Sequence, residues 1–181
     1  MERRPLVIAC GDRQGRFEDS AGLAMTPRVL VLAPTRRART ETFVRANLAR
    51  LPFAVEACFG DEMPWREPLK ALYGLAVLTS KVCTRLGWLR LATLPTSIVA
   101  MLLVKRHRPD VVMVEFGFHA VRVMELACTG VPLAVHFRGA DASAERYLNR
   151  LEQRYRRLFR LTSAVIVKNQ TMRSRLIALG A

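Results

Sequence analysis

Two short apolar runs that each lead into polar and glycine residues constrain the fold of this chain most strongly. The run Val111–Val114 is followed by Glu115–Gly117, and the run Leu133–Val135 is followed shortly afterwards by Arg138–Asp141. A strand buried on both faces of a parallel sheet reads as a continuous apolar run. Open α/β sheets bind their ligands beyond the carboxyl ends of the strands. The two polar clusters are therefore predicted to lie where such a fold binds its ligands.

The same pattern of apolar runs and helical spacing continues along most of the chain. Strands are predicted at 28–33, 53–59, 110–115, 132–137 and 164–167, and helices at 40–51, 69–86, 98–107, 120–128, 144–159 and 171–179. This alternation, with right-handed crossovers, predicts an α/β fold: a Rossmann-like, doubly wound parallel sheet with helices on both faces.

The N-terminal segment differs from the rest. Residues 1–25 show no periodicity and carry Gly11, Gly15 and Gly22 among charged residues. We predict a poorly ordered extension over 1–25 and a single domain over 26–181. Met25 stands directly before the first strand and could be the biological start in place of Met1.

Charge and composition narrow the class of protein. The net charge is +14 over 181 residues, and the basic residues are interleaved with apolar ones. Such a surface attracts phosphate-bearing partners, whether nucleic acid, nucleotide or anionic lipid, although solvated faces of amphipathic helices explain it equally well. The longest clean apolar run, Ile98–Val104, is far below the roughly 20 residues of a membrane span, and no secretory signal is convincing. A cytoplasmic protein, soluble or on a membrane surface, is expected.

Known phosphate-binding and metal-binding motifs are missing. The exit of the first strand, Pro34–Phe43, contains no glycine, so a dinucleotide-binding loop is not supported, and there is no P-loop. The helix N-terminus there is flanked by Arg36, Arg37 and Arg39, which could contact a phosphate or be ordinary solvated arginines. The four cysteines are scattered without metal-ligand spacing, so no metal site is predicted and free thiols are expected.

Candidate functional side chains remain at the strand exits. Glu115 and Asp141 could face one cleft, where a carboxylate could act as a base or orient a sugar hydroxyl. Asp141 could instead cap the following helix. His119 follows a strand exit and is well placed for chemistry, whereas His136, inside a strand, is interpreted as a core histidine. No catalytic set can be assembled from spacing, so the catalytic residues stay unknown.

Four segments together resemble a known family. They are Thr40–Phe43 after the first strand, Arg108–Gly117, Gly130–Ser143, and the closing stretch from Ala164 to Gly180. Their order and spacing are similar to the N-terminal domain of glycosyltransferases of the GT-B fold, in particular the retaining family 4. Thr40–Phe43 resembles the corresponding motif of exopolysaccharide-type members.

This resemblance implies a function. In such enzymes the N-terminal domain mainly receives the acceptor, and a C-terminal domain holds the nucleotide-sugar donor. We therefore expect the acceptor-binding half of a hexosyltransferase of exopolysaccharide biosynthesis, incomplete and inactive alone, with no cofactor bound by this chain. The implied partners are the missing donor-binding domain and a glycan or lipid-linked acceptor.

The resemblance also implies which residues line the acceptor site. Gly139 and Asp141 match the family motif, and Glu41 matches the acidic residue of the first segment. Glu115, Gly117 and His119 belong to the predicted cleft by position. Two residues depart from the family: Arg138 and Lys168 replace a histidine and a serine. Arg138 could contact an acceptor phosphate or the donor diphosphate.

Other interpretations remain open. The basic, apolar stretch 69–108 could rest on anionic lipid at the inner face of a membrane, or it could form ordinary core helices. A non-enzymatic basic module would bind nucleic acid with steep salt dependence, but the arginines are not interleaved with exposed aromatics, which makes nucleic acid an unfavoured partner. A partner subunit that pairs with a separate donor domain is the second alternative.

Overall fold

In the computed structural model, the residues described are 6–9, 26–34, 46, 48–59, 69–88 and 91–181. Strands in this part of the chain form a parallel sheet in the order β1-β6-β5-β4-β2-β3. They are β1 Leu6–Ala9, β2 Arg28–Ala33, β3 Ala54–Phe59, β4 Val111–Glu115, β5 Leu133–His136 and β6 Ala164–Val167. Every neighbouring pair is parallel, which confirms the predicted α/β fold.

The helices lie close to their predicted positions. They are α2 Leu69–Arg85, α3 Leu94–His107, α4 Gly117–Val123, α5 Ala140–Ser143, α6 Glu145–Leu161 and α7 Gln170–Ala178, with short 3₁₀ turns η2 Leu91–Thr93 and η3 Met124–Thr129. α3 begins earlier than predicted because Pro95 belongs to its first turn, where a proline ring costs no hydrogen bond. The helix predicted at 120–128 is instead α4 followed by η3. Most of the helix predicted at 40–51 lies outside the described residues.

Strand β1 corrects the prediction for the N-terminal segment. Leu6–Ala9 pairs in parallel with β6, from Leu6 opposite Ala164 to Ala9 opposite Val167. The expectation of poor order was wrong for these four residues, because a short apolar run can satisfy the backbone groups of an otherwise open sheet edge. Residues 1–5 and 10–25 of the predicted extension lie outside the described part.

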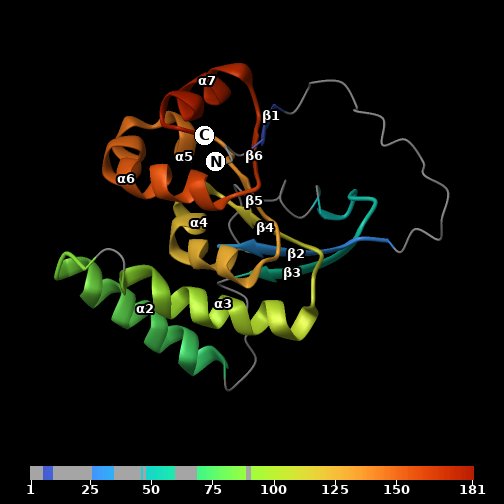
Figure 1. The fold of residues 1–181 in the computed structure, drawn as a ribbon, viewed down its shortest axis with the longest axis vertical. Coiled ribbons are helices and arrows are strands. Elements are labelled where there is room, and N and C mark those ends of the chain that lie inside the picture. The colour runs from blue at the N-terminus through green and yellow to red at the C-terminus, as the bar shows by residue number, and fades with distance from the viewer. Residues whose placement is uncertain (1–5, 10–25, 35–45, 47, 60–68, 89–90) are drawn as a thin grey trace.

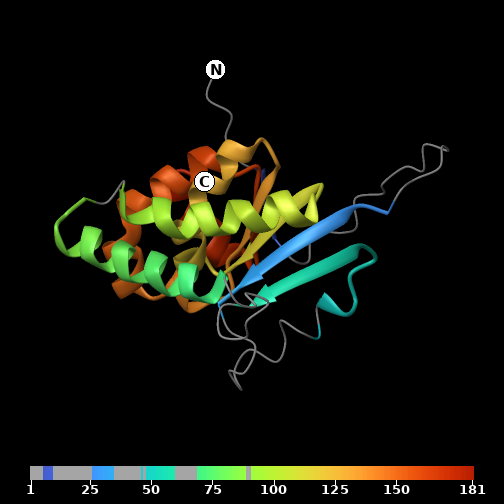
Figure 2. The ribbon, with the colours of Figure 1, turned by 90° about the horizontal axis from the view of Figure 1, so that it is seen from below.

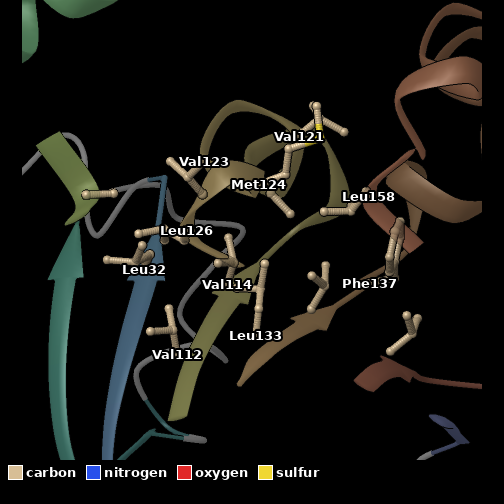
Figure 3. Close-up of a cluster of buried hydrophobic side chains, with 14 of the residues drawn as sticks. Leu32, Val112, Val114, Val121, Val123, Met124, Leu126, Leu133, Phe137 and Leu158 are labelled. Atoms are coloured by element: carbon tan, nitrogen blue, oxygen red, sulfur yellow. The ribbon is translucent and has the colours of Figure 1, made fainter. Parts of the chain in front are cut away.

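The main core lies between one face of the sheet and the helices. Leu32, Val112, Val114 and Leu133 point from the strands toward Val121, Val123, Met124, Leu126 and Leu158 of α4, η3 and α6, as Figure 3 shows. Figures 1 and 2 show α3, α4 and α6 stacked along this side of the sheet, with α2 outside α3. Side chains alternate along a strand, so Glu115 and His136 face the other side.

The order of the strands indicates where a ligand crevice is expected. The chain runs from β2 outward to β3 and then returns across β2 to β4, so the winding direction reverses between β2 and β4. Parallel sheets of this type bind ligands outside the carboxyl ends of the strands at such a switch point. The exit of β4, at Glu115 and Phe116, borders this position directly.

Candidate functional site

The carboxyl ends of β4 and β5 bring three ionisable side chains together. Glu115 and His136 are register partners on neighbouring strands, and Nδ1 of His136 lies 3.6 Å from Oε2 of Glu115. Nε and Nη2 of Arg138 donate to Oε2 and Oε1 of Glu115, each at 2.6 Å. All three side chains are buried, Glu115 completely. Glu115 and Arg138, predicted to lie close together, therefore form a bidentate ion pair.

The contacts of Glu115 decide its charge. Burial alone would raise its pKa, but the nearby His136 ring, the two hydrogen bonds from Arg138 and the positive charge of that guanidinium group hold the pKa below its ordinary value. The carboxylate is therefore ionised at neutral pH, with both oxygens bonded to Arg138. In this arrangement Glu115 orients the guanidinium group of Arg138 and does not present a free base.

Asp141 joins the two strand exits. Its carboxylate accepts hydrogen bonds from the backbone N–H groups of Gly117 at 2.8 Å, Arg138 at 3.0 Å and Gly139 at 2.8 Å. Gly117 follows β4 and the other two follow β5, so one buried side chain fixes both loops. The capping alternative was wrong for the long helix: α6 begins at Glu145 and has no side-chain cap, whereas Asp141 lies within the short α5.

The backbone at the exit of β4 is unusual. Phe116 has a φ of 69°, a region that non-glycine residues rarely occupy and that often occurs at binding sites. At Gly117 an added Cβ would lie 2.1 Å from Cε1 of Phe137, so only glycine allows the loop to approach that ring. The chain is therefore held in a strained, closely packed turn beside the predicted crevice.

His119 follows the exit of β4 in sequence, on α4. It is buried on α4, and burial, together with the charge of Arg122, lowers its pKa to about 4. The imidazole is therefore neutral at neutral pH. Within the described residues, no hydrogen bond or ion pair joins its ring to Glu115, Arg138 or Asp141. The other predicted site residues, Glu41, Arg36, Arg37 and Arg39, lie outside the described part of the chain.

Sequence reasoning missed Tyr155 as a part of this site. Its hydroxyl group donates to the backbone oxygen of Asp141 at 3.0 Å, and its ring packs edge-on against Phe137. The sequence places Tyr155 on the apolar stripe of α6. A tyrosine on a buried stripe needs a partner for its hydroxyl group, and that was the available signal.

A metal centre is not formed by the residues that can be described. Among them, no group of three or more histidine, cysteine, aspartate or glutamate side chains could hold a metal ion. Cys58, Cys83 and Cys128 are free thiols.

Comparison with known proteins decides the family. The family model of the glycosyl transferase 4-like domain matches residues 28–181. The chain belongs to this family. The glycosyl transferase 4-like domain is the N-terminal half of a GT-B fold, and the match spans the five parallel strands from β2 to β6, which confirms the resemblance inferred from the four segments. Searches of curated proteins and of solved structures gave no match.

Proposed function

We propose that this glycosyl transferase 4-like domain binds the acceptor of a sugar transfer at the carboxyl edge of β2, β4 and β5. The completed enzyme moves a hexose from a nucleotide-sugar to a glycan or lipid-linked acceptor. The family supplies the class of reaction. The observation that carries the location is the buried Asp141 carboxylate, which holds the exits of β4 and β5 together beside the switch point.

The surroundings of this edge support an open binding surface. An added Cβ at Gly139 would meet no atom within 4 Å, so the backbone there borders open space. Arg138 is fixed from the inside by Glu115, which preorganises the loop that carries Gly139. A preorganised loop spends less binding energy on ordering itself around a sugar.

The donor is proposed to come from elsewhere. A GT-B enzyme has two facing halves, and this domain corresponds to the N-terminal one. We therefore assign the nucleotide-sugar to a C-terminal donor-binding domain that acts with this one. The likeness of Thr40–Phe43 to exopolysaccharide-type members favours a growing polysaccharide precursor as the acceptor.

A membrane surface is the proposed setting. Within the described residues no helix is long and apolar enough to cross a membrane. However, Leu75, Leu78 and Val82 expose 48–59% of their surface along one side of α2, and its only buried side chain among those described is Ala76. Residues 69–109 contain no acidic residue. This apolar and purely basic surface suits the headgroup region of an anionic bilayer, which carries the complementary charge, better than it suits a protein core.

Backbone NMR with acceptor and donor analogues tests the acceptor assignment. Short glycans and a water-soluble prenyl diphosphate sugar are titrated into the labelled chain, and a nucleotide-sugar is titrated separately. We expect the acceptor analogues to shift the amide signals of Phe116–His119 and Arg138–Asp141. The proposal fails if the nucleotide-sugar alone shifts these signals, or if every acceptor shifts only signals elsewhere.

A further inference from the structure

A groove lined by cationic side chains lies between α2, α4 and α6. It consists of two adjoining cavities of about 650 and 430 Å³, which share the lining residues Thr84, Arg122, Arg150 and Arg154. The three arginines come from α4 and α6, helices that stack on the same side of the sheet in Figure 1. The groove is thus lined by residues other than Glu115, Arg138 and Asp141.

The positive charge of this groove is not balanced by ion pairs among the described residues. Lys81 and Arg85 of α2 add to the lining of the smaller cavity. The carboxylate that lines the larger one, Glu152, is paired with Arg156 at 3.0 Å. In the part of the chain that the structure describes, no ion pair involves the three shared arginines.

The arginines of α6 differ in their partners. Arg157, on the same helix, pairs with Glu125, with Nη2 and Oε1 2.6 Å apart. By contrast, Nη2 of Arg154 is buried and has no hydrogen-bond partner among the described residues. Burial, followed by the charges of Arg150 and Arg122, lowers the pKa of Arg154. An anion in the groove would relieve this unfavourable burial and repulsion.

The groove is held in shape before any ligand arrives. The hydroxyl groups of Thr96 and Ser97, both buried on α3, donate to the backbone oxygen of Arg122 at 2.5 and 3.3 Å. Arg150 and Arg154 are one turn apart on α6, so their side chains leave the same face. Like charges at this spacing repel each other in the absence of a counter-ion.

We propose that this groove binds a phosphate or diphosphate group through Arg122, Arg150 and Arg154. Guanidinium groups are planar, always charged and matched in geometry to phosphate oxygens. The cavities are larger than one phosphate, and the rings of Phe118 and Tyr147 also line the larger one, 5.9 Å apart between centroids. These rings provide a surface for a sugar or hydrocarbon group attached to the phosphate.

The phosphate can come from a soluble molecule or from a lipid headgroup. The exposed apolar side of α2 adjoins the groove, because Lys81, Thr84 and Arg85 of the same helix line it. Neither source requires an acceptor at the strand edge, so the groove stands independently of the proposed function.

Binding of pyrophosphate and of phosphatidic acid vesicles tests the groove with the full chain. The test variant is Arg150→Gln/Arg154→Gln, and the matched control is Arg28→Gln/Arg160→Gln, which removes two exposed arginines outside the groove. We expect the test variant to weaken pyrophosphate binding at least about tenfold, and the control to change it by less than about twofold. The unfolding midpoint of the test variant without ligand should stay unchanged or rise, because a repulsion is removed.

The outcomes separate the two sources. Loss of pyrophosphate binding in the test variant alone supports a soluble phosphate ligand. Loss of vesicle binding in the test variant alone, without measurable pyrophosphate binding by the wild type, supports a lipid headgroup. Equal losses in the test and control variants, or no binding of either probe by the wild type, overturn the proposal.

Discussion

Arg138, which follows β5, donates two hydrogen bonds of 2.6 Å to the buried carboxylate of Glu115 at the end of the neighbouring strand β4. The two residues are 23 positions apart in sequence, and neither side chain has more than 4% of its surface exposed. The pair links the end of β4 to the loop after β5, where we propose that the acceptor binds. Because it is desolvated, each charge depends on the other.

Removal of one partner of this pair should be costly. Arg138→Met leaves Glu115 charged and buried without its counter-ion, and we expect a loss of about 3–5 kcal/mol in the free energy of unfolding. The double variant Glu115→Leu/Arg138→Met should be much more stable than Arg138→Met alone. Urea denaturation measures both. Glu152→Gln, which breaks the half-exposed pair with Arg156, is the control and should cost less than about 1 kcal/mol. An equally small loss for Arg138→Met would contradict the account.

Acid should destabilise the domain partly through His119. Its pKa is about 4 in the folded state and 6.5 ordinarily, so the unfolded chain binds the proton first as the pH falls. Stability should therefore decrease from about pH 6.5 down to about pH 4, by about 3 kcal/mol from this group. Unfolding curves of wild type and His119→Gln across this range measure the difference. Parallel pH profiles for the two proteins would refute the assignment.

Two glycines should respond in opposite ways to alanine. Gly117→Ala places a Cβ against the ring of Phe137 and should cost about 1–3 kcal/mol. Gly74→Ala, within α2 and with nothing near its added Cβ, should stabilise by up to about 1 kcal/mol. Thermal unfolding of both variants checks this. Similar effects of the same sign would show that the β4 exit is not packed as described.

The strands could be predicted from the sequence because a buried strand shows its burial in its own consecutive apolar residues. Runs such as Val111–Val114 are continuous since both faces of the sheet are covered. β1 was not predicted because its four apolar residues lie in a segment without periodicity, although such a run is long enough for an edge strand. The helix predicted at 120–128 is divided into α4 and η3, and the spacing of its apolar residues does not indicate this division.

The meeting of the site's side chains at the strand ends was predictable, but their hydrogen bonds were not. Glu115, Arg138 and Asp141 follow or end neighbouring parallel strands, so they must lie at the same carboxyl end of the sheet. Which oxygen accepts from which group depends on the turn at Phe116 and on the side of the sheet that each side chain faces. The arginine groove could not be predicted from the sequence, because Arg122 and Arg154 are 32 positions apart and meet only in the folded chain.

Membrane contact should depend on the apolar side of α2. Leu75→Gln/Leu78→Gln removes two side chains that are each 59% exposed, and we expect flotation with anionic vesicles to fall severalfold without loss of stability. Phe53→Gln/Ile177→Gln, at exposed apolar positions outside α2, should leave flotation unchanged. Neutral vesicles should bind the wild type weakly. Equal binding by both double variants would exclude this surface as the contact.

The affinity of Asp141→Asn for an acceptor analogue, beside that of Asp110→Asn, tests the central claim most directly. Asp110 also accepts a backbone hydrogen bond, from Arg28 at 2.8 Å, but it precedes β4 at the opposite edge of the sheet. Isothermal titration with the prenyl diphosphate sugar should show binding weakened about tenfold or more in Asp141→Asn and unchanged in Asp110→Asn. Unchanged affinity in a folded Asp141→Asn protein would contradict an acceptor site at the exits of β4 and β5.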